Sequence, residues 1–327
     1  MRFGACFAVV FSTLLLLVSP DVNARAPRRG RTRQAPPPTL TVPEGTRLLV
    51  VAPHPDDETL GAGGLIQRVH ATGGSVKVVY LTDGDGYPEG VKVEDHVQSP
   101  TAADYRGYGR LRRHEARAAL RALGLDASSA TFLSFPDGGL CQLMHRYWSE
   151  RRAAYRSPYT RLDRPPASEI LVPDSEYRGE DLTQELAQII GDFKPTMIVV
   201  TRREDQHADH CAAWFFVTDA LTDVRRVHPD FTADVLTYVI HFYQWPFNDE
   251  GPRLEPPPLR GGASGWMRFP LTPAETRAKR IALGRYETQM KVMDWFLKGF
   301  ARTNEVFSRP ADTRVSLPTR GSPCCDR

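Results

Sequence analysis

The stretch Arg47-Leu48-Leu49-Val50-Val51-Ala52-Pro53-His54-Pro55-Asp56-Asp57-Glu58-Thr59 joins a short apolar run to a polar loop. The run 47–52 has the length and branched side chains of a buried strand, and it stops at a proline. The segment 60–72 that follows is expected to be helical. A strand that leads through such a loop into a helix is the first unit of an α/β fold.

The same pattern of a strand followed by a helix recurs along the chain. Further strands are expected at 76–82, 131–135, 196–201 and 234–240, and further helices at 104–123, 182–191, 207–222 and 272–298. Buried strands that alternate with amphipathic helices predict a parallel sheet with helices on both faces. The expected fold class is α/β, a three-layer Rossmann-like fold with a mostly parallel sheet.

The composition is that of an ordinary globular protein, with 41% hydrophobic and 25% charged residues among 327. These values exclude fibrous, collagenous and wholly disordered chains. The 42 basic and 39 acidic side chains give a formal net charge of +3, which is too small to indicate nucleic-acid binding. Proline is in excess at 27 residues, and its clusters at 36–38, 165–166 and 256–258 predict a tether and two loops.

Residues 1–26 have the pattern of a secretory signal peptide. An uncharged run from Ala5 to Val18 follows Arg2, and Ala24 or Ala26 suits cleavage. This run would span about 21 Å as a helix, short of a membrane core of about 30 Å, so no stable membrane span is expected in the mature chain. We expect export to the periplasm or the extracellular space. Disulfides are stable there, and the sequence leaves open how four cysteines pair: Cys141, Cys211, Cys324 and Cys325.

The mature chain is expected to form one domain behind a tether. Residues 27–45 are dominated by arginine and proline and predict a disordered segment. Residues 46–327 hold all the strands and helices named above. Ligands of open parallel sheets bind beyond the carboxyl ends of the strands. This rule selects four polar or glycine-rich loops, at 53–59, 83–87, 136–140 and 202–210.

The first and the fourth of these loops carry residues suited to metal binding. Asp56 and Asp57 crowd beside His54, and solvent or a cation must compensate their like charges. His207 and His210 lie three residues apart on one face of a helix start. Two imidazoles and one carboxylate, with a fourth position open to water, form the pattern of catalytic zinc. The spare carboxylate can take a proton from water and the spare imidazole can stabilise an oxyanion, but spacing alone does not say which residue takes which role.

At these residues the chain resembles the PIG-L/LmbE-like family of zinc-dependent N-acetylglucosamine deacetylases. The run 52–58 with Gly61 and Gly63-Gly64 resembles the first motif of the family, and His207-Ala208-Asp209-His210 resembles the second. Further matches extend the resemblance over roughly 47–292, at 81–84, Arg112 with Glu115, 136–138 and 279–289.

The resemblance implies a role for each motif residue. The implied metal is Zn2+, with Fe(II), Co(II) or another divalent ion as alternatives, and its implied ligands are His54, Asp57 and His210. The implied catalytic residues are Asp56 as general base, His207 as oxyanion donor and Asp209 as a carboxylate that orients an imidazole. Candidate contacts to the substrate are Arg112, Asp83 and Asp137.

The function implied is that of a hydrolase that removes acetyl from an N-acetylated amino sugar or glycoconjugate. Two alternatives stay open: hydrolysis of another amide, such as an acylated amino-sugar conjugate, and a catalytically idle sugar-binding module. Asp56 favours an enzyme, because a binding module has no need of a carboxylate beside the metal ligands. An insertion at about 141–180 departs from the compact members, and its arginines and aromatic rings suit either sugar and anion contacts or a solvated excursion.

Overall fold

A computed structural model of the protein describes residues 37–327 except 152, 248–250, 260–264, 311–323 and 325–327. The chain divides into two units, 1–36 and 37–327. The expected signal peptide and the first part of the expected tether lie outside the described residues. The second unit contains every helix and strand described below.

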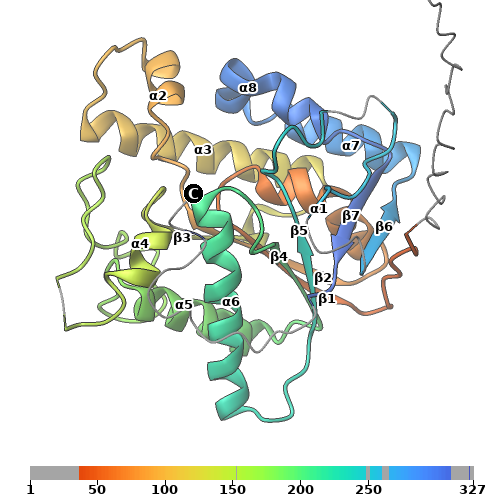
Figure 1. Ribbon diagram of the computed structural model, residues 1–327, viewed down its shortest axis with the longest axis horizontal. Coiled ribbons are helices and arrows are strands. Elements are labelled where there is room, and N and C mark those ends of the chain that lie inside the picture. The colour runs from red at the N-terminus through yellow and green to blue at the C-terminus, as the bar shows by residue number, and fades with distance from the viewer. Residues whose placement is uncertain (1–36, 152, 248–250, 260–264, 311–323, 325–327) are drawn as a thin grey trace, which may run out of the picture. The chain divides into compact units, whose positions relative to one another are not determined.

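A seven-stranded sheet forms the centre of this unit (Figure 1). The strands stand in the order β3 (Ala130–Phe135), β2 (Ser75–Thr82), β1 (Arg47–Ala52), β4 (Met197–Thr201), β5 (Asp234–Tyr238), β7 (Asn304–Ser308) and β6 (Trp266–Pro270). Strands β1 to β5 pair in parallel, whereas β7 runs antiparallel to β5, and β6 runs antiparallel to β7. The prediction of a mostly parallel sheet is confirmed.

Both faces of the sheet are covered by helices, because successive side chains of a strand point to opposite faces. In β1, Leu48 and Val50 enter one apolar core and Leu49 and Val51 enter the other. The first core is completed by α1 (Asp57–Ala71), α3 (Ala102–Ala122), α7 (Pro273–Leu283) and α8 (Glu287–Gly299), and the second by α4 (Leu140–His145), α5 (Gly179–Phe193) and α6 (Ala208–Val227). Figure 1 shows these helix layers on either side of the sheet, which confirms the three-layer architecture. A short helix, α2 (Pro88–Asp95), and a 3-10 turn at Ala127–Ser129 complete the described elements.

The order of the strands places a crevice beside β1. The chain proceeds from β1 to β2 and β3 on one side and then returns to β4 on the other side. At such a reversal the loops that leave the two central strands diverge, and ligands bind between them. The loop after β1 carries His54, and the loop after β4 leads into α6, whose first turn carries His210.

The prediction of a single helix over 272–298 is wrong. The structure has two helices there, α7 and α8, with a turn between Leu283 and Glu287. Tyr286 lies in this turn, fully buried, and its hydroxyl donates to Glu58. Strands β6 and β7 and helices α2 and α4 were also not predicted.

The described end of the expected tether packs against the sheet. The amide of Leu40 donates to the carbonyl of Arg268 in β6 at 2.7 Å, and the amide of Arg268 donates to the carbonyl of Pro38 at 2.8 Å. The side chain of Leu40 is only 4% exposed. Residues 38–40 of the expected tether thus pack against the fold, because the edge strand β6 offers free backbone groups and the core takes up the side chain of Leu40.

The insertion is also packed rather than solvated. The ring of Trp148 stacks on Phe216 of α6 with 6.2 Å between the centroids. The amide of Tyr155 donates to the carbonyl of Tyr177 at 3.0 Å, which closes the segment on itself. The alternative of a solvated excursion is thus excluded for its described aromatic residues.

One disulfide joins Cys211 of α6 to Cys324, across 113 residues of sequence. Both cysteines are fully buried in the second core. This bond answers part of the pairing that the sequence left open, and Cys141 is disulfide-bonded as well. The end of the described chain is thereby fixed to the helix that carries His210.

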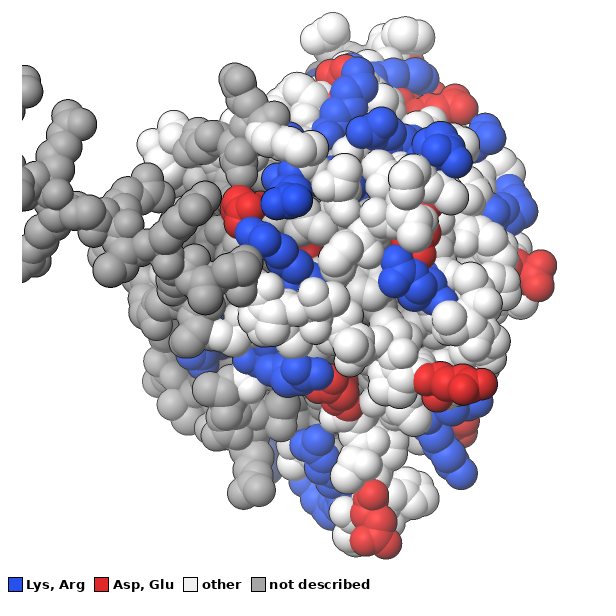
Figure 2. Space-filling view, turned by 90° about the vertical axis from the view of Figure 1, so that its right-hand side faces the viewer, with Lys and Arg blue, Asp and Glu red and all other residues white. Residues whose placement is uncertain are grey.

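The surface carries charges of both signs. Figure 2 shows basic and acidic side chains scattered among uncharged ones over one face, as the nearly balanced totals of 42 and 39 would give. Within the described residues, none of the helices combines the length and the apolar character that crossing a membrane requires.

Candidate metal centre

Three side-chain atoms from the first and fourth loops form a nearly equilateral triangle. His54 Nδ1 lies 3.2 Å from His210 Nε2, and each of these nitrogens lies 3.2 Å from Asp57 Oδ2. All three residues are buried, with 7% exposure at most. The structure therefore brings together the three residues proposed as metal ligands, with one possible ligand atom of each at a corner of the triangle.

The size of this triangle fits a tetrahedral metal ion. Ligand atoms at about 2.0–2.1 Å from zinc are about 3.3–3.4 Å apart when the geometry is tetrahedral. The observed separations of 3.2 Å are close to this value. Two imidazole nitrogens that face each other at this distance cannot both donate, whereas a cation would satisfy both lone pairs. Ligand-capable atoms of His207, and separately of Asp137 and Asp209, also lie within 4.8 Å of those of His54.

The turn after β1 sets the ligands of the first loop. The backbone amide of His54 donates to Asp57 Oδ2 at 2.9 Å. This hydrogen bond holds the two residues together without a metal ion. Helix α1 begins at Asp57, and residue Asp56 before it has a φ of 129°. A non-glycine residue rarely adopts this conformation, and such strain is common at functional sites.

Two carboxylates orient the imidazole of His54. Its Nε2 lies 3.2 Å from Asp137 Oδ1 and 3.4 Å from Asp209 Oδ2. Asp209 in turn accepts from the amides of Gly138 at 2.7 Å and Leu140 at 3.0 Å. A proton on Nε2 leaves Nδ1 free to bind a metal, which is the arrangement that carboxylates behind a ligating histidine produce.

Asp205, which was not among the residues predicted for the site, orients the imidazole of His210 in the same way. Asp205 Oδ2 lies 3.2 Å from His210 Nδ1. The same carboxylate accepts from the amides of Ile240 at 2.7 Å, His241 at 3.1 Å and His207 at 3.0 Å. It is fully buried, so one side chain fixes the loops after β4 and β5 together. The signal available in the sequence was a carboxylate two residues before His207.

The electrostatic environment of the triangle favours positive charge. Burial opposes protonation of His210, yet Asp57 and Asp205 raise its pKa to about 9. Burial also opposes protonation of His54. The neighbouring carboxylates, of which Asp137 has the largest effect, nevertheless hold the pKa of His54 well above its usual value. A bound divalent ion would satisfy these carboxylates while the imidazoles stay neutral.

Asp56 lies beside the triangle without belonging to it. Its Oδ2 accepts from Arg112 at 3.1 Å, and the same guanidinium donates to the carbonyls of Pro55 and Gly84, at 2.6 and 2.9 Å. Burial raises the pKa of Asp56 to about 8, while the charge of Arg112 acts in the opposite direction. A carboxylate with a raised pKa is suited to accept and return a proton.

His207 stands at the start of α6 with one nitrogen committed to the backbone. Its Nδ1 accepts from the amide of Asp209 at 3.3 Å. Burial, with the charges of His54 and His210, lowers its pKa to about 4. The imidazole is therefore neutral at pH 7, and its proton is on Nε2. His207 is only half-buried, so this N–H is accessible to a ligand.

The three candidate substrate contacts are engaged with protein groups. Arg112 binds Asp56, as described, and Asp137 faces His54 while it accepts from the amide of Gly86 at 2.6 Å. Asp83 accepts from Ser134 at 3.1 Å and lies 3.6 Å from Arg113, so it faces a different cavity. Arg112 and Asp137 thus position the site, and Asp83 is not brought to the triangle by any contact in the described structure.

An aromatic cleft that was not predicted from the sequence adjoins the metal centre. It is lined by 241–245, Phe247, Trp295 and Phe296 and has a volume of about 630 Å³. The ring of His241 lies 5.3 Å from that of His207 and stacks on Phe296 at 5.1 Å. Trp295 is 60% exposed. The cleft thus leads from the solvent to the half-buried His207.

Fold and site together define a class: an α/β protein with a metal-capable centre of two histidines and one aspartate at the switch point of a parallel sheet. The model of the PIG-L family, described as GlcNAc-PI de-N-acetylase, matches residues 49–221. The chain belongs to this family. The resemblance inferred from the motifs is confirmed.

The relatives include deacetylases of an inositol-linked acetamido sugar. The chain is 32% identical over 180 residues to 1D-myo-inositol 2-acetamido-2-deoxy-alpha-D-glucopyranoside deacetylase 1 of Saccharopolyspora erythraea, which covers 54% of this chain and 52% of the relative. A deacetylase of the same description from Mycobacterium sp. (strain KMS) is 30% identical over 194 residues, 58% of this chain and 55% of the relative. The chain thus matches about half the length of these relatives. Among solved structures, a conserved protein from Thermus thermophilus aligns over 84% of this chain and 100% of its own, with 23% identity and a TM-score of 0.49.

Proposed function

We propose that this protein is a metal-dependent hydrolase that removes acetyl from an N-acetylated amino sugar or glycoconjugate. The observation that carries the proposal is the triangle of His54 Nδ1, Asp57 Oδ2 and His210 Nε2 with 3.2 Å sides, beside a buried carboxylate that is not part of it. Membership of the PIG-L family and the names of the relatives, which are deacetylases of an acetamido sugar, support the reaction and the substrate class.

We assign zinc to the centre, held by His54, Asp57 and His210. Two imidazoles and one carboxylate are a donor set that zinc prefers. When bound, the ion would polarise the carbonyl of the acetamido group and lower the pKa of a water molecule. The alternatives Fe(II) and Co(II) accept the same donors, so metal analysis of the purified protein decides among them.

Asp56 is the residue that moves protons in this proposal. Its carboxylate accepts a proton from the attacking water and returns it to the nitrogen of the leaving amine. Arg112 holds the carboxylate in place through a buried hydrogen bond of 3.1 Å. Arg112 is therefore a positioning residue, and its loss would act through Asp56.

His207 and Asp209 stabilise the charge that develops when water adds to the carbonyl. The Nε2–H of neutral His207 donates to the oxygen that becomes negative when water adds to the carbonyl. The backbone amide of Asp209 donates to His207 Nδ1 at 3.3 Å. This hydrogen bond favours the tautomer of His207 with its proton on Nε2, which the donation requires. The aromatic cleft next to His207 offers flat apolar surfaces of the kind that pack against sugar rings.

The test is release of acetate from a panel of N-acetylated sugars, inositol conjugates and cell-wall fragments, with and without a chelator. We expect chelator-sensitive release from at least one acetamido sugar. Asp56→Ala should keep its metal and lose most turnover, whereas Asp230→Ala, at an exposed carboxylate, should behave as the parent. Release from other acyl amides alone would favour the alternative amidohydrolase. Metal and sugar binding without any release would favour the idle binding module.

We also propose that the protein is exported after cleavage near Ala24 or Ala26. The buried disulfide between Cys211 and Cys324 supports an oxidising compartment, because such bonds are rare in the cytosol. Cell fractionation and sequencing of the mature amino terminus test this proposal. Full-length protein in the cytosol with free thiols at both positions would contradict it.

A further inference from the structure

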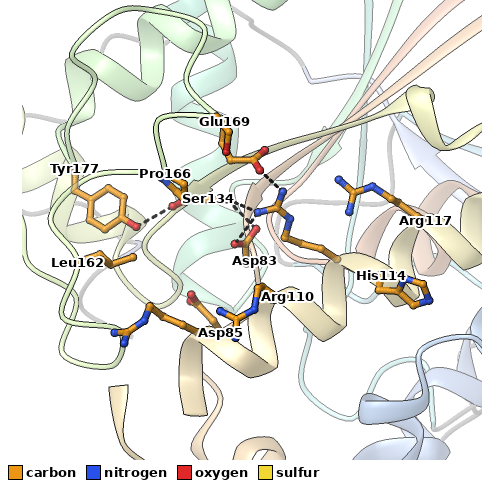
Figure 3. Close-up of a pocket in the computed structure, with 13 residues that line it drawn as sticks. Asp83, Asp85, Arg110, His114, Arg117, Ser134, Leu162, Pro166, Glu169 and Tyr177 are labelled. Carbon is orange, nitrogen blue, oxygen red and sulfur yellow. Dashed lines mark hydrogen bonds and ion pairs between the residues drawn. The ribbon is translucent and has the colours of Figure 1, made fainter. Parts of the chain in front are cut away.

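A second cavity lies between α3 and the insertion, and none of the proposed reaction steps uses it. It has a volume of about 490 Å³, within the range of small-molecule sites. One wall is helix α3, and the opposite wall comes from residues of the insertion, including Leu162, Glu169 and Tyr177. Figure 3 shows Arg110 near Asp85 and Arg117 farther along the helix, with Glu169 and Tyr177 on the side of the insertion.

Four arginines of α3 line this cavity: Arg106, Arg110, Arg113 and Arg117. Their spacing of four, three and four residues places them on a single face of the helix. Arg112, which directly precedes Arg113, instead faces Asp56 beside the metal centre. The arginine cavity and the metal centre are thus served by different faces of the same helix.

The guanidinium groups of the arginine cavity outnumber the carboxylates that pair with them. Arg113 pairs with both Glu169 and Asp83. Arg106 donates to the carbonyl of Thr160 at 2.7 Å, and Arg117 lies 4.6 Å above the ring of Phe132. Neither of these two has an ion-pair partner among the described residues, and Arg110 makes no hydrogen bond or ion pair within them.

The remaining acidic residue of the cavity does not restore the balance. Asp85 lines it, but burial, and then the neighbouring carboxylate of Asp83, raise its pKa well above the usual range. Even with Asp85 charged, only three carboxylates, those of Asp83, Asp85 and Glu169, face the four guanidinium groups. The cavity therefore carries an excess of positive charge on one side.

We propose that the arginine cavity binds a phosphate-type oxyanion, either free phosphate or the phosphoryl group of a small molecule. Guanidinium groups bind phosphate through paired, charge-assisted hydrogen bonds, and three of the four here have no carboxylate of their own. The volume of about 490 Å³ exceeds that of a single phosphate and leaves room for the group that carries it. The arginines on the insertion itself do not make this site, since Arg156 and Arg164 bind the carbonyl of Arg161 and the carboxylate of Glu176.

The proposal is tested by calorimetric titration of the metal-loaded protein with inorganic phosphate and, separately, with glucose 6-phosphate at low salt. We expect saturable binding of at least one of them. Tighter binding of the sugar phosphate would identify a phosphoryl substituent as the ligand, and equal or weaker binding would identify free phosphate. Absence of saturable binding by the parent protein would overturn the proposal.

Variants of α3 separate this cavity from any other anion site, including the metal centre. Arg110→Gln should weaken phosphate binding about tenfold, the typical effect of losing one hydrogen bond to a charged group. Arg110→Gln with Arg117→Gln should weaken it further. The matched control is Arg121→Gln, an exposed arginine of the same helix outside the cavity, which should bind as the parent does.

Thermal unfolding without phosphate checks that each variant is folded. If the double variant does not fold, Arg110→Gln alone decides, because that side chain is exposed and makes no contact that folding needs. Unchanged phosphate affinity in Arg110→Gln would overturn the proposal. Acetate release should be the same in Arg110→Gln and in the parent, which keeps this test independent of the proposed reaction.

Discussion

Replacing Asp205 by asparagine tests whether the buried carboxylate behind His210 controls the metal centre. The substitution keeps the size of the side chain and removes its charge. Asp205 accepts from three backbone amides and lies 3.2 Å from His210 Nδ1. Asparagine has only one acceptor oxygen, so its NH2 group must face at least one of these N–H donors.

The magnitude follows from these contacts. If the asparagine oxygen takes the place of Oδ2, the amides of Ile240 and His241 stay paired, and the amide of His207 loses its acceptor. A buried donor without a partner costs about 1–3 kcal/mol of folding free energy. Loss of the charge behind a ligating histidine lowers metal affinity about 10- to 100-fold, which is about 1.4–2.7 kcal/mol of binding free energy.

The assay is competition for zinc against a chromophoric chelator, with chemical unfolding of each variant measured in parallel. Glu204→Gln is the matched control, because this half-buried carboxylate precedes Asp205 in the chain and pairs with Arg202 and Arg203. The control should bind zinc as the parent does. Parental zinc affinity in Asp205→Asn would refute the inference that this carboxylate orients a ligand.

Three other substitutions test separate parts of the structure. His207→Ala should lower turnover by about 100-fold or more while metal content is unchanged, as expected for one oxyanion donor; a loss of only a few-fold would remove His207 from that role. Lys279→Met should lower the free energy of unfolding by about 3–5 kcal/mol, because it leaves Glu305, 2.7 Å from the ammonium, as a buried charge without its cation; urea unfolding beside the exposed-lysine control Lys298→Met measures this. Cys324→Ser should cost about 2–5 kcal/mol by opening a loop of 113 residues, and the same unfolding curve as the parent would contradict a stabilising disulfide.

The central part of the fold could be predicted because its strands are buried on both faces. In β1 every residue from Leu48 to Ala52 is apolar, and the structure divides them between two cores. The antiparallel strands β6 and β7 could not be predicted in this way. β7 contains Glu305, which is fully buried because it accepts from the amides of Gly64 and Leu65 and from Lys279. Only the folded chain supplies those partners.

The site was predictable where its residues are neighbours in sequence. His54 and Asp57, and likewise His207 and His210, are close along the chain, and the sheet topology brings the two pairs together. The direction of an isolated carboxylate was not predictable. Asp83 and Asp137 both follow strands, but Asp83 turns toward Arg113 and Asp137 toward His54. The partner of each carboxylate comes from a distant part of the chain, Arg113 of α3 for Asp83 and His54 after β1 for Asp137, so the local sequence does not reveal it.

The backbone of Asp56 has a consequence for the evolution and engineering of this protein. Glycine adopts a φ of 129° without steric strain, whereas an aspartate at this φ carries a strain energy of about 1–3 kcal/mol. A search for more stable variants would therefore select Asp56→Gly. This substitution relieves the backbone strain and also removes the proposed general base. Under the proposed function, thermostability and turnover compete for the same residue, so stabilised libraries of this protein should be screened for acetate release before they are ranked by melting temperature.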